Sequence, residues 1–196
     1  MTTTETTQTS QDERTLQVYR VYIKVTPEKV WQAITEPEWN ARYGYAAPQY
    51  FELRPGGSYR STASEEMRKV SDEMGYGIPD VVVDGEVLEV DPPRKLVQTF
   101  RMLMDPASAA DGFTQLTYEI FEVSPGVSRL TVTHDVTGAP NLAAVVGGAY
   151  EDQGGGGGGG WAGSSATSSR CWRRVRSSPG ENVLPSRFGV LPHGRP

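Results

Sequence analysis

The sequence predicts an α+β fold built on an antiparallel sheet of about seven strands, with two short helices after the first strand. Seven segments are rich in the β-branched and aromatic residues that strands favour. Turns such as Asp91-Pro92-Pro93-Arg94 and Ser124-Pro125-Gly126 join consecutive segments, and short turns between neighbouring strands imply antiparallel pairing. The helical signals are grouped and do not alternate with the strands, which argues against a parallel sheet.

The first strand is expected over residues 16–25, and two short helices should follow it. Thr26 is a typical N-cap residue, and Pro27 suits the first position of a helix. Thr35-Glu36-Pro37-Glu38 has the spacing of a capping box, with Ser or Thr at the cap and Glu three residues later. We therefore expect a second helix to begin there at once and to run to about Tyr43.

The remaining strands follow the two helices. We expect them over residues 50–53, 58–62, 81–90, 95–103, 113–123 and 128–137. Arg54-Pro55-Gly56-Gly57 is predicted to be a hairpin turn. Residues 64–74 have apolar side chains at helical spacing and a glycine stop at Gly75, so we predict a short helix or a lid-like loop there.

Composition excludes several classes of protein. A length of 196 residues fits one domain with tails. The single cysteine, Cys171, excludes a disulfide framework and a cysteine zinc site, and two histidines exclude a histidine-rich metal centre. The net charge of −5 argues against a nucleic-acid partner. With no apolar run of ~18 residues and no signal peptide, we expect a cytoplasmic protein without membrane insertion, cofactor or metal.

Three parts of the chain differ in composition. Residues 1–15 are polar and Thr-rich, and we expect a disordered leader. Residues 16–153 are expected to form the folded domain. Residues 154–196 begin with seven glycines and continue as a tail rich in Arg, Ser, Pro and Gly, which predicts a linker and disorder. Residues 161–196 hold 6 basic and 1 acidic side chains (+5), against 13 and 23 in residues 1–160 (−10).

Three motifs connect the chain with a known family. They are Thr26-Pro27-Glu28-Lys29-Val30-Trp31, Arg54-Pro55-Gly56-Gly57 and Gly85-Glu86-Val87-Leu88-Glu89-Val90-Asp91-Pro92-Pro93-Arg94. With them, residues 16–162 resemble the stand-alone bacterial relatives of the C-terminal domain of the activator of Hsp90 ATPase, within the START-like (SRPBCC) superfamily. The resemblance implies a helix-grip fold, in which a curved antiparallel sheet grips a long C-terminal helix and a hydrophobic cavity lies between them.

The chain departs from that family where the closing helix should stand. In such relatives a Gly-rich segment and a Trp lead directly into the helix, whereas here Gly160-Trp161-Ala162 is followed by the tail. One explanation is the loss of one base near codon 162. Restoring a T before one possible coding of residues 163–174 yields Trp-Val-Leu-Ser-Asp-Leu-Lys-Ser-Leu-Leu-Glu-Thr, an amphipathic helix. The alternative is a natural disordered tail that replaces the helix.

His134 is the first candidate site residue. Alternation along residues 128–137 places Leu130, Val132, His134 and Val136 on one face, so His134 should point to the apolar, concave side. It then acts as a polar anchor for a ligand in the cavity, or it is a packed histidine bonded to a neighbour.

Aromatic and polar side chains elsewhere complete the predicted ligand site. Gln98, Phe100 and Tyr118 are candidates for the wall of the cavity, or else they are plain core residues. Trp39 and Tyr43 belong to the two-helix region, which closes one end of the cavity in the resembled fold, so each is an entrance residue or a core residue. The inward register of these strands stays open, because a slip of one residue reverses it.

The resemblance favours binding of a small hydrophobic molecule as the function. One alternative is an interaction module that contacts an Hsp90-type chaperone. Another is an enzyme of the cyclase or aromatase kind, with His134 or Tyr118 as acid or base. We assign no catalytic residue, because no Ser-His-Asp order, carboxylate pair or metal constellation is evident, and no oligomeric state is predicted.

Overall fold

The structure is a computed structural model that describes residues 14–42, 46–73, 75–149 and 160–161. Its strands are β1 (Leu16–Ile23), β2 (Gln49–Phe51), β3 (Gly57–Thr62), β4 (Val81–Asp91), β5 (Lys95–Met102), β6 (Thr114–Ser124) and β7 (Val127–Asp135). Its helices are α1 (Pro27–Thr35), α2 (Pro37–Asn40), α3 (Glu65–Glu73), α4 (Pro106–Ala110) and α5 (Pro140–Val146). The predicted α+β class is confirmed.

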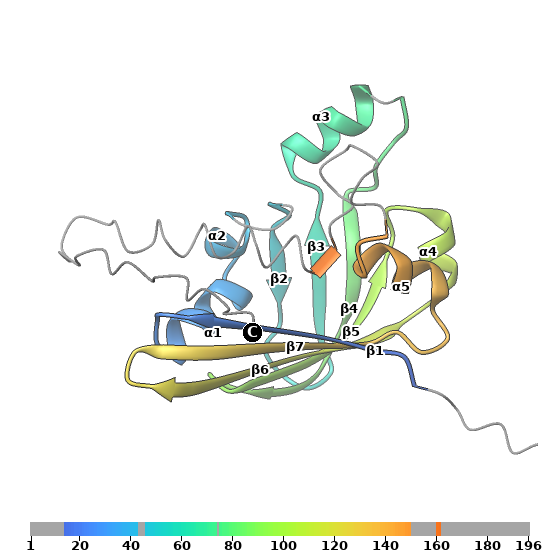
Figure 1. Ribbon diagram of the computed structural model, residues 1–196. Coiled ribbons are helices and arrows are strands. Elements are labelled where there is room, and N and C mark those ends of the chain that lie inside the picture. The colour runs from blue at the N-terminus through green and yellow to red at the C-terminus, as the bar shows by residue number, and fades with distance from the viewer. Residues whose placement is uncertain (1–13, 43–45, 74, 150–159, 162–196) are drawn as a thin grey trace, which may run out of the picture.

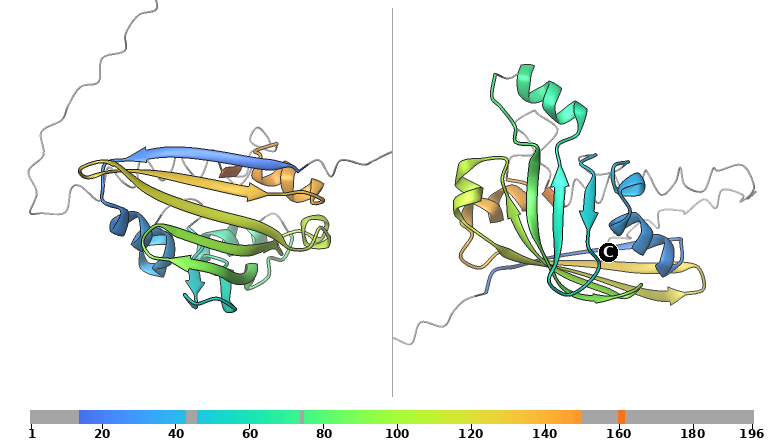
Figure 2. Two further views of the ribbon diagram at one scale, coloured as in Figure 1. Left: turned by 90° about the horizontal axis from the view of Figure 1, so that it is seen from below. Right: turned by 180° about the vertical axis from the view of Figure 1, so that it is seen from behind.

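One antiparallel sheet contains all seven strands, in the order β1-β7-β6-β5-β4-β3-β2. The sheet curves, and α1 and α2 lie near one end of its concave side while α4 and α5 lie near the other (Figure 1). Helix α3 projects beyond the ends of β3 and β4, as the second view in Figure 2 also shows. The element order and the curvature match the helix-grip fold that the sequence implied.

The concave face of the sheet forms the hydrophobic core. Leu96 and Leu116 are fully buried on β5 and β6, and Leu142 of α5 is buried with them. On β7, Val132 and His134 are buried on this same face, as their alternation predicted. We call the opposite side of the sheet, which is turned away from the helices, the outer face.

The hairpin between β2 and β3 explains the two glycines of its turn. Gly56 has a φ of 76°, in the left-handed region that glycine reaches without strain. At Gly57 a Cβ atom would overlap the backbone oxygen of Glu52, so no side chain fits there. Both glycines are therefore required by the backbone path.

Local predictions were wrong at two places. Thr35 does not cap α2: its hydroxyl donates to the carbonyl of Trp31 inside α1, and Glu36 occupies the N-cap position without a side-chain bond. Helices α4 and α5 were not predicted. Each is short and begins with proline, and the Asp105 side chain caps α4 by accepting from the Ser108 amide at 2.8 Å.

Other predictions fall outside the described residues. These are the disordered leader over residues 1–15, except for residues 14 and 15, and the position of Tyr43. They also include the linker and tail over residues 154–196, except for Gly160 and Trp161, together with the frameshift interpretation. For residues 64–74, where a short helix or a lid-like loop was predicted, the structure shows the helix α3. None of the helices in the described ranges is long and apolar enough to cross a membrane.

Candidate functional site

A row of side chains crosses the concave face through five neighbouring strands. Strand register aligns Gln17 of β1 with His134 of β7, His134 with Leu116 of β6, Leu116 with Gln98 of β5, and Gln98 with Val87 of β4. We call these five residues the cross-strand row. All except Gln17 are fully buried. The row therefore combines aliphatic side chains with three polar ones in the interior of the molecule.

The two glutamines of the row differ in their hydrogen bonds. The Gln17 Nε2 donates to the carbonyl of Ala143 at 2.8 Å, and its Oε1 accepts from the Tyr19 hydroxyl at 3.0 Å. Gln98 is fully buried, and neither its Nε2 nor its Oε1 makes a hydrogen bond of normal geometry with the described residues, although its amide is close enough to the Tyr59 hydroxyl to lower the pKa of Tyr59. Leaving such a group unpaired costs about 1–3 kcal/mol. A bound polar group would therefore gain the most hydrogen-bond energy on this face by pairing with Gln98.

His134 lies at the centre of a directed series of hydrogen bonds. The indole Nε1 of Trp161 donates to its Nδ1 at 3.1 Å, and its Nε2 lies 2.8 Å from the Thr114 Oγ1. Thr114 in turn donates to the carbonyl of Phe100 at 2.9 Å. Because an indole only donates, Nδ1 must be the acceptor and Nε2 must carry the proton that Thr114 accepts. Both ring nitrogens are therefore engaged within the chain.

Burial keeps His134 neutral. It lowers the pKa of His134 to about 4, and the neighbouring Asp135 carboxylate opposes this only weakly. The lowered pKa agrees with the hydrogen bonds, because a protonated Nδ1 could no longer accept from Trp161. Burial likewise raises the pKa of Tyr59 well above its usual range, and the nearby Gln98 amide offsets this only in part. The interior of this face therefore disfavours charge of either sign.

The rings of Phe100, His134 and Trp161 form one aromatic cluster. Phe100 packs edge-on against His134 with ring centroids 5.1 Å apart. Trp161 lies over both, at 5.9 Å from His134 and 6.4 Å from Phe100. Trp161 belongs to the segment that the sequence assigned to the linker and tail, yet it contacts the sheet. The short helical piece that holds it lies above the sheet in Figure 1.

The structure brings together four of the six predicted site residues. Gln98, Phe100, Tyr118 and His134 all lie on the concave face, and Tyr118 is aligned with Leu96 and Val132 in the row next to the cross-strand row. Trp39 is partly buried on α2, which packs against α1 and β2, and the Arg42 guanidinium lies 5.0 Å from its ring centroid. Tyr43 lies outside the described residues.

Sequence reasoning missed Thr114, Trp161 and Tyr59 as contributors to this face. Thr114 could have been found, because it alternates with Leu116 and Tyr118 along one strand. Trp161 carried no such signal, because its contact with His134 spans 27 residues and follows a run of glycines. The Tyr59 hydroxyl donates to the Gln49 Oε1 at 3.1 Å, a pairing across the β2–β3 hairpin.

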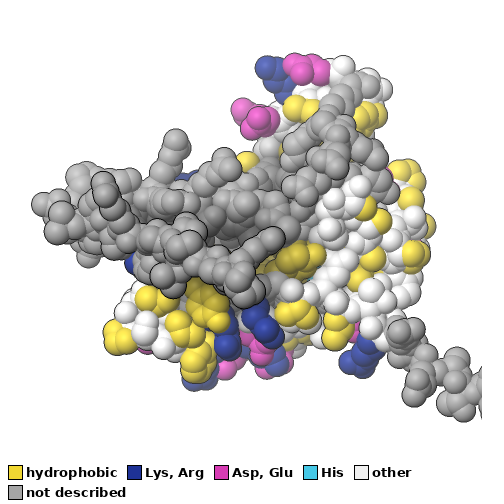
Figure 3. Space-filling model, viewed as in Figure 1, with side chains coloured by type: hydrophobic (Ala, Val, Ile, Leu, Met, Phe, Trp, Pro, Cys, Tyr) yellow, Lys and Arg dark blue, Asp and Glu magenta, His cyan; other side chains and the backbone are white. Residues whose placement is uncertain are grey.

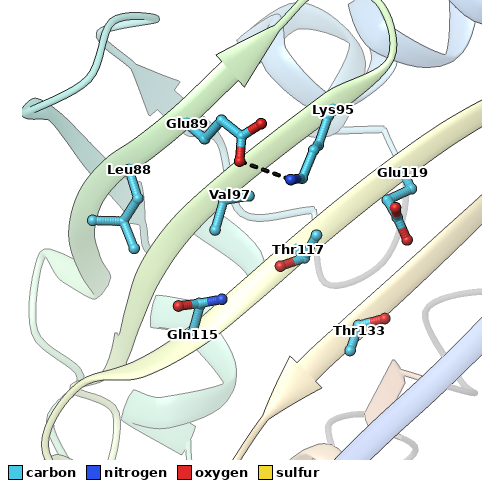
Figure 4. A pocket seen from close by; sticks show the side chains of 8 residues that line it. All are labelled: Leu88, Glu89, Lys95, Val97, Gln115, Thr117, Glu119 and Thr133. Carbon is cyan, nitrogen blue, oxygen red and sulfur yellow. Dashed lines mark hydrogen bonds and ion pairs between the residues drawn. The ribbon is translucent and has the colours of Figure 1, made fainter.

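An open depression of about 470 Å³ lies on the outer face (Figure 4). Leu88, Val97, Thr117 and Thr133 contribute to its lining, together with charged side chains. The charge of Lys95 is compensated there, because its Nζ lies 2.7 Å from the Glu89 Oε2, and this contact raises the pKa of Lys95. The lining has no unpaired buried polar atom of the kind found at Gln98. We therefore place the candidate site on the concave face.

A second exposed feature of the outer face is a short row at the end of the sheet where β6 turns into β7. Register aligns Tyr22, Arg129 and Phe121 across three strands, and we call them the outer aromatic row. Tyr22 is 65% exposed and Phe121 is 60% exposed, with the Arg129 guanidinium 5.5 Å from the Phe121 ring centroid. Figure 3 shows hydrophobic side chains gathered at this end of the molecule. Such exposed aromatic area is typical of contact surfaces.

Metal and acid–base chemistry receive no positive support from the described part of the chain. Within it, no three His, Cys, Asp or Glu side chains converge in a way that could hold a metal ion. His134 has no ring nitrogen turned to a substrate, since Trp161 and Thr114 occupy both. The concave face instead combines apolar side chains with the buried amide of Gln98, which makes no hydrogen bond of normal geometry with the described residues.

Comparison with known proteins relates the chain to one family. The family model described as Activator of Hsp90 ATPase homolog 1-like protein matches residues 24–156. Among solved structures, protein MLL2253 from Mesorhizobium loti is similar, with 22% identity, a TM-score of 0.57 and coverage of 82% of this chain and 98% of that one.

Two further solved structures support the same fold. A protein from Rhodobacter sphaeroides has 21% identity, a TM-score of 0.55 and coverage of 85% and 95% of the two chains. Protein NE0264 from Nitrosomonas europaea has 18% identity, a TM-score of 0.55 and coverage of 83% and 97%. At these identities the likeness concerns the fold alone. No curated protein matches the chain.

Proposed function

The chain belongs to the family of Activator of Hsp90 ATPase homolog 1-like proteins, and on that premise we propose that it binds a small hydrophobic molecule at the concave face of its sheet. The ligand lies over the cross-strand row, with Leu116 and Phe100 supplying apolar contact. Burial of apolar surface supplies most of the affinity, at about 25 cal/mol for each Å² removed from water.

The single observation that supports this proposal is the state of Gln98. A buried amide without partners is rare in native proteins, because each unpaired polar atom costs free energy. Here it occurs in the middle of an apolar face, beside the fully buried Leu116 and Val87. Ligand sites combine such apolar walls with a few placed polar groups. Gln98 therefore has the position of a polar anchor, while His134 fixes the surrounding rings.

The remaining predicted residues take supporting roles in this proposal. Tyr118 and Phe100 form walls of the site, and Trp161 contributes a further wall where it donates to His134. Trp39 contributes from the α2 end, where it packs against the core. His134 acts on the ligand through the rings that it orients, because its nitrogens are occupied.

A pair of phenylalanine substitutions on one strand tests the proposal. Leu116→Phe enlarges a buried side chain of the concave face, and Thr117→Phe adds the same ring to the outer face one residue later. We expect wild type and Thr117→Phe to bind 2-ethylnaphthalene in equilibrium dialysis and Leu116→Phe to lose that binding. Circular dichroism checks that both variants fold, since overpacking a core costs about 1–3 kcal/mol. Absence of binding to wild type, or loss only in Thr117→Phe, contradicts the proposal.

The outer aromatic row supports a second candidate, an interaction module that contacts an Hsp90-type chaperone. Exposed aromatic side chains beside an arginine are typical of interface anchors. We propose that Tyr22 and Phe121 meet the chaperone there, with Arg129 held between them by strand register. The family supplies the choice of partner.

This second candidate is tested by the ATPase rate of Hsp90 with the full chain added. Wild type should change the rate, and Phe121→Ser should lose the effect. Leu88→Ser is the matched control, because Leu88 is also exposed on the outer face but lies outside the outer aromatic row. An unchanged rate with wild type, or an equal loss in both variants, contradicts the candidate.

A further inference from the structure

The unpaired amide of Gln98 carries information about the chemistry of the ligand. A primary amide offers two N–H donors on Nε2 and an acceptor on Oε1, side by side. At Gln98 neither atom has a partner within the described residues, and the side chain is fully buried. A ligand that supplied only an acceptor or only a donor would leave one of the two atoms unpaired. Full pairing requires both, spaced as they are in another amide.

The surroundings of Gln98 exclude an ionised group. The buried polar side chains of the described residues are Ser, Thr, Asn, Gln and His, and none of them is Asp, Glu, Lys or Arg. His134 cannot act as a countercharge, because its Nδ1 accepts from Trp161 and its Nε2 proton is directed at Thr114. A buried carboxylate or ammonium without a partner of opposite charge is strongly disfavoured. The polar group of the ligand must therefore be neutral.

Resting on the proposed function, we propose that the ligand is an uncharged, largely apolar molecule that bears a carboxamide or lactam, paired through two hydrogen bonds with the Gln98 side chain. The N–H of the ligand donates to Oε1, and its carbonyl accepts from Nε2. Leu116 and Val87, which flank Gln98 in the cross-strand row, contact the apolar part. The two hydrogen bonds fix the ligand in one orientation. Because the ligand is uncharged, it can be buried without a partner of opposite charge.

A series of probes with one ring system separates the requirements. 2-Naphthamide carries a donor and an acceptor, methyl 2-naphthoate carries acceptors only, 2-ethylnaphthalene carries neither, and 2-naphthoate is charged. Equilibrium dialysis measures each against the full chain at pH 7. We expect 2-naphthamide to bind about tenfold more tightly than the ester, which corresponds to about 1.4 kcal/mol. The charged 2-naphthoate should bind most weakly of the four.

Matched variants connect this preference with Gln98. Gln98→Leu removes the amide from the concave face, whereas Gln115→Leu makes the same change at an exposed position of the outer face. Gln98→Leu should bind 2-naphthamide and the ester equally, and it should unfold at a higher temperature than wild type, because it no longer buries an unpaired amide. Gln115→Leu should keep the tenfold preference. Gln98→Met, which preserves side-chain length, serves as a second test if Gln98→Leu does not fold.

The outcomes distinguish this inference from the proposed function. If wild type binds 2-ethylnaphthalene and 2-naphthamide with equal affinity, the hydrophobic site stands and the amide inference is overturned. The same conclusion follows if Gln98→Leu retains the preference, or if 2-naphthoate binds best. If none of the four probes binds wild type, the proposed function itself is contradicted and this inference falls with it.

Discussion

Replacing His134 by glutamine should remove a large part of the acid sensitivity of the protein. His134 is fully buried, and burial lowers its pKa from 6.5 to about 4. At a pH between these two pKa values, His134 is protonated in the unfolded chain and neutral in the folded chain. The contribution of neutral His134 to stability is therefore complete above pH 6.5 and is lost as the pH falls towards 4. The difference between the two pKa values corresponds to about 3 kcal/mol in the free energy of unfolding, because one pKa unit is worth about 1.4 kcal/mol.

Urea unfolding of wild type and His134→Gln at pH 7, 6, 5 and 4 measures this effect. Subtracting the two free energies of unfolding cancels the carboxylates with lowered pKa values, such as Asp111, which lose stability over the lower part of this range in both proteins. The free energy of unfolding of wild type minus that of His134→Gln should fall by about 3 kcal/mol between pH 7 and pH 4. Trp161→Phe lacks the donor to Nδ1, so its folded form should bind the proton on His134 more readily than wild type does. Its loss of stability should begin at the same pH as that of wild type, near 6.5, but should end at a higher pH and be smaller. A difference that does not change with pH would refute the buried, neutral histidine.

Three further substitutions test the packing around the site. Leu116→Ala should lower the free energy of unfolding by about 2–5 kcal/mol, because it leaves a cavity in the core, whereas the exposed Leu88→Ala should stay within about 0.5 kcal/mol of wild type. Gly57→Ala should destabilise by about 1–3 kcal/mol, because the new Cβ meets backbone rather than a flexible side chain. Asp105→Ala should cost about 1 kcal/mol through loss of the α4 cap, and Asp105→Asn should recover most of it. Urea unfolding measures all of these changes. If Leu116→Ala or Gly57→Ala left the free energy of unfolding unchanged, the close packing described at that position would be contradicted.

The strands were predictable because their signals are local. Alternation along β7 placed His134 on the buried face, and the same period assigns Gln98 and Phe100 to one face of β5. Glycine and proline marked the turns between strands with little ambiguity. Short helices were harder to recognise, because α4 and α5 have 5 and 7 residues, too few to show a helical period. The proline at the start of each was the available signal.

The chemistry of the site could not be predicted from single residues. That Gln98 lacks partners while Gln17 has two depends on which residues the strand register and α5 bring near each amide. The engagement of both His134 nitrogens likewise depends on Thr114 of a neighbouring strand and on Trp161, far along the chain. Sequence alternation showed which side chains share a face, but it left open which face of β5 and β6 points inward, and it contained no information on how the polar atoms pair.

The most direct test of the proposed site is methyl NMR of leucine- and valine-labelled protein during addition of 2-ethylnaphthalene. Leu116 and Leu96 report on the concave face, and Leu88 and Val97 report on the outer depression. Binding at the concave face predicts saturable shifts at Leu116 and Leu96 and no comparable shift at Leu88. Shifts confined to Leu88 and Val97, or none at any of the four, would contradict a ligand site over the cross-strand row.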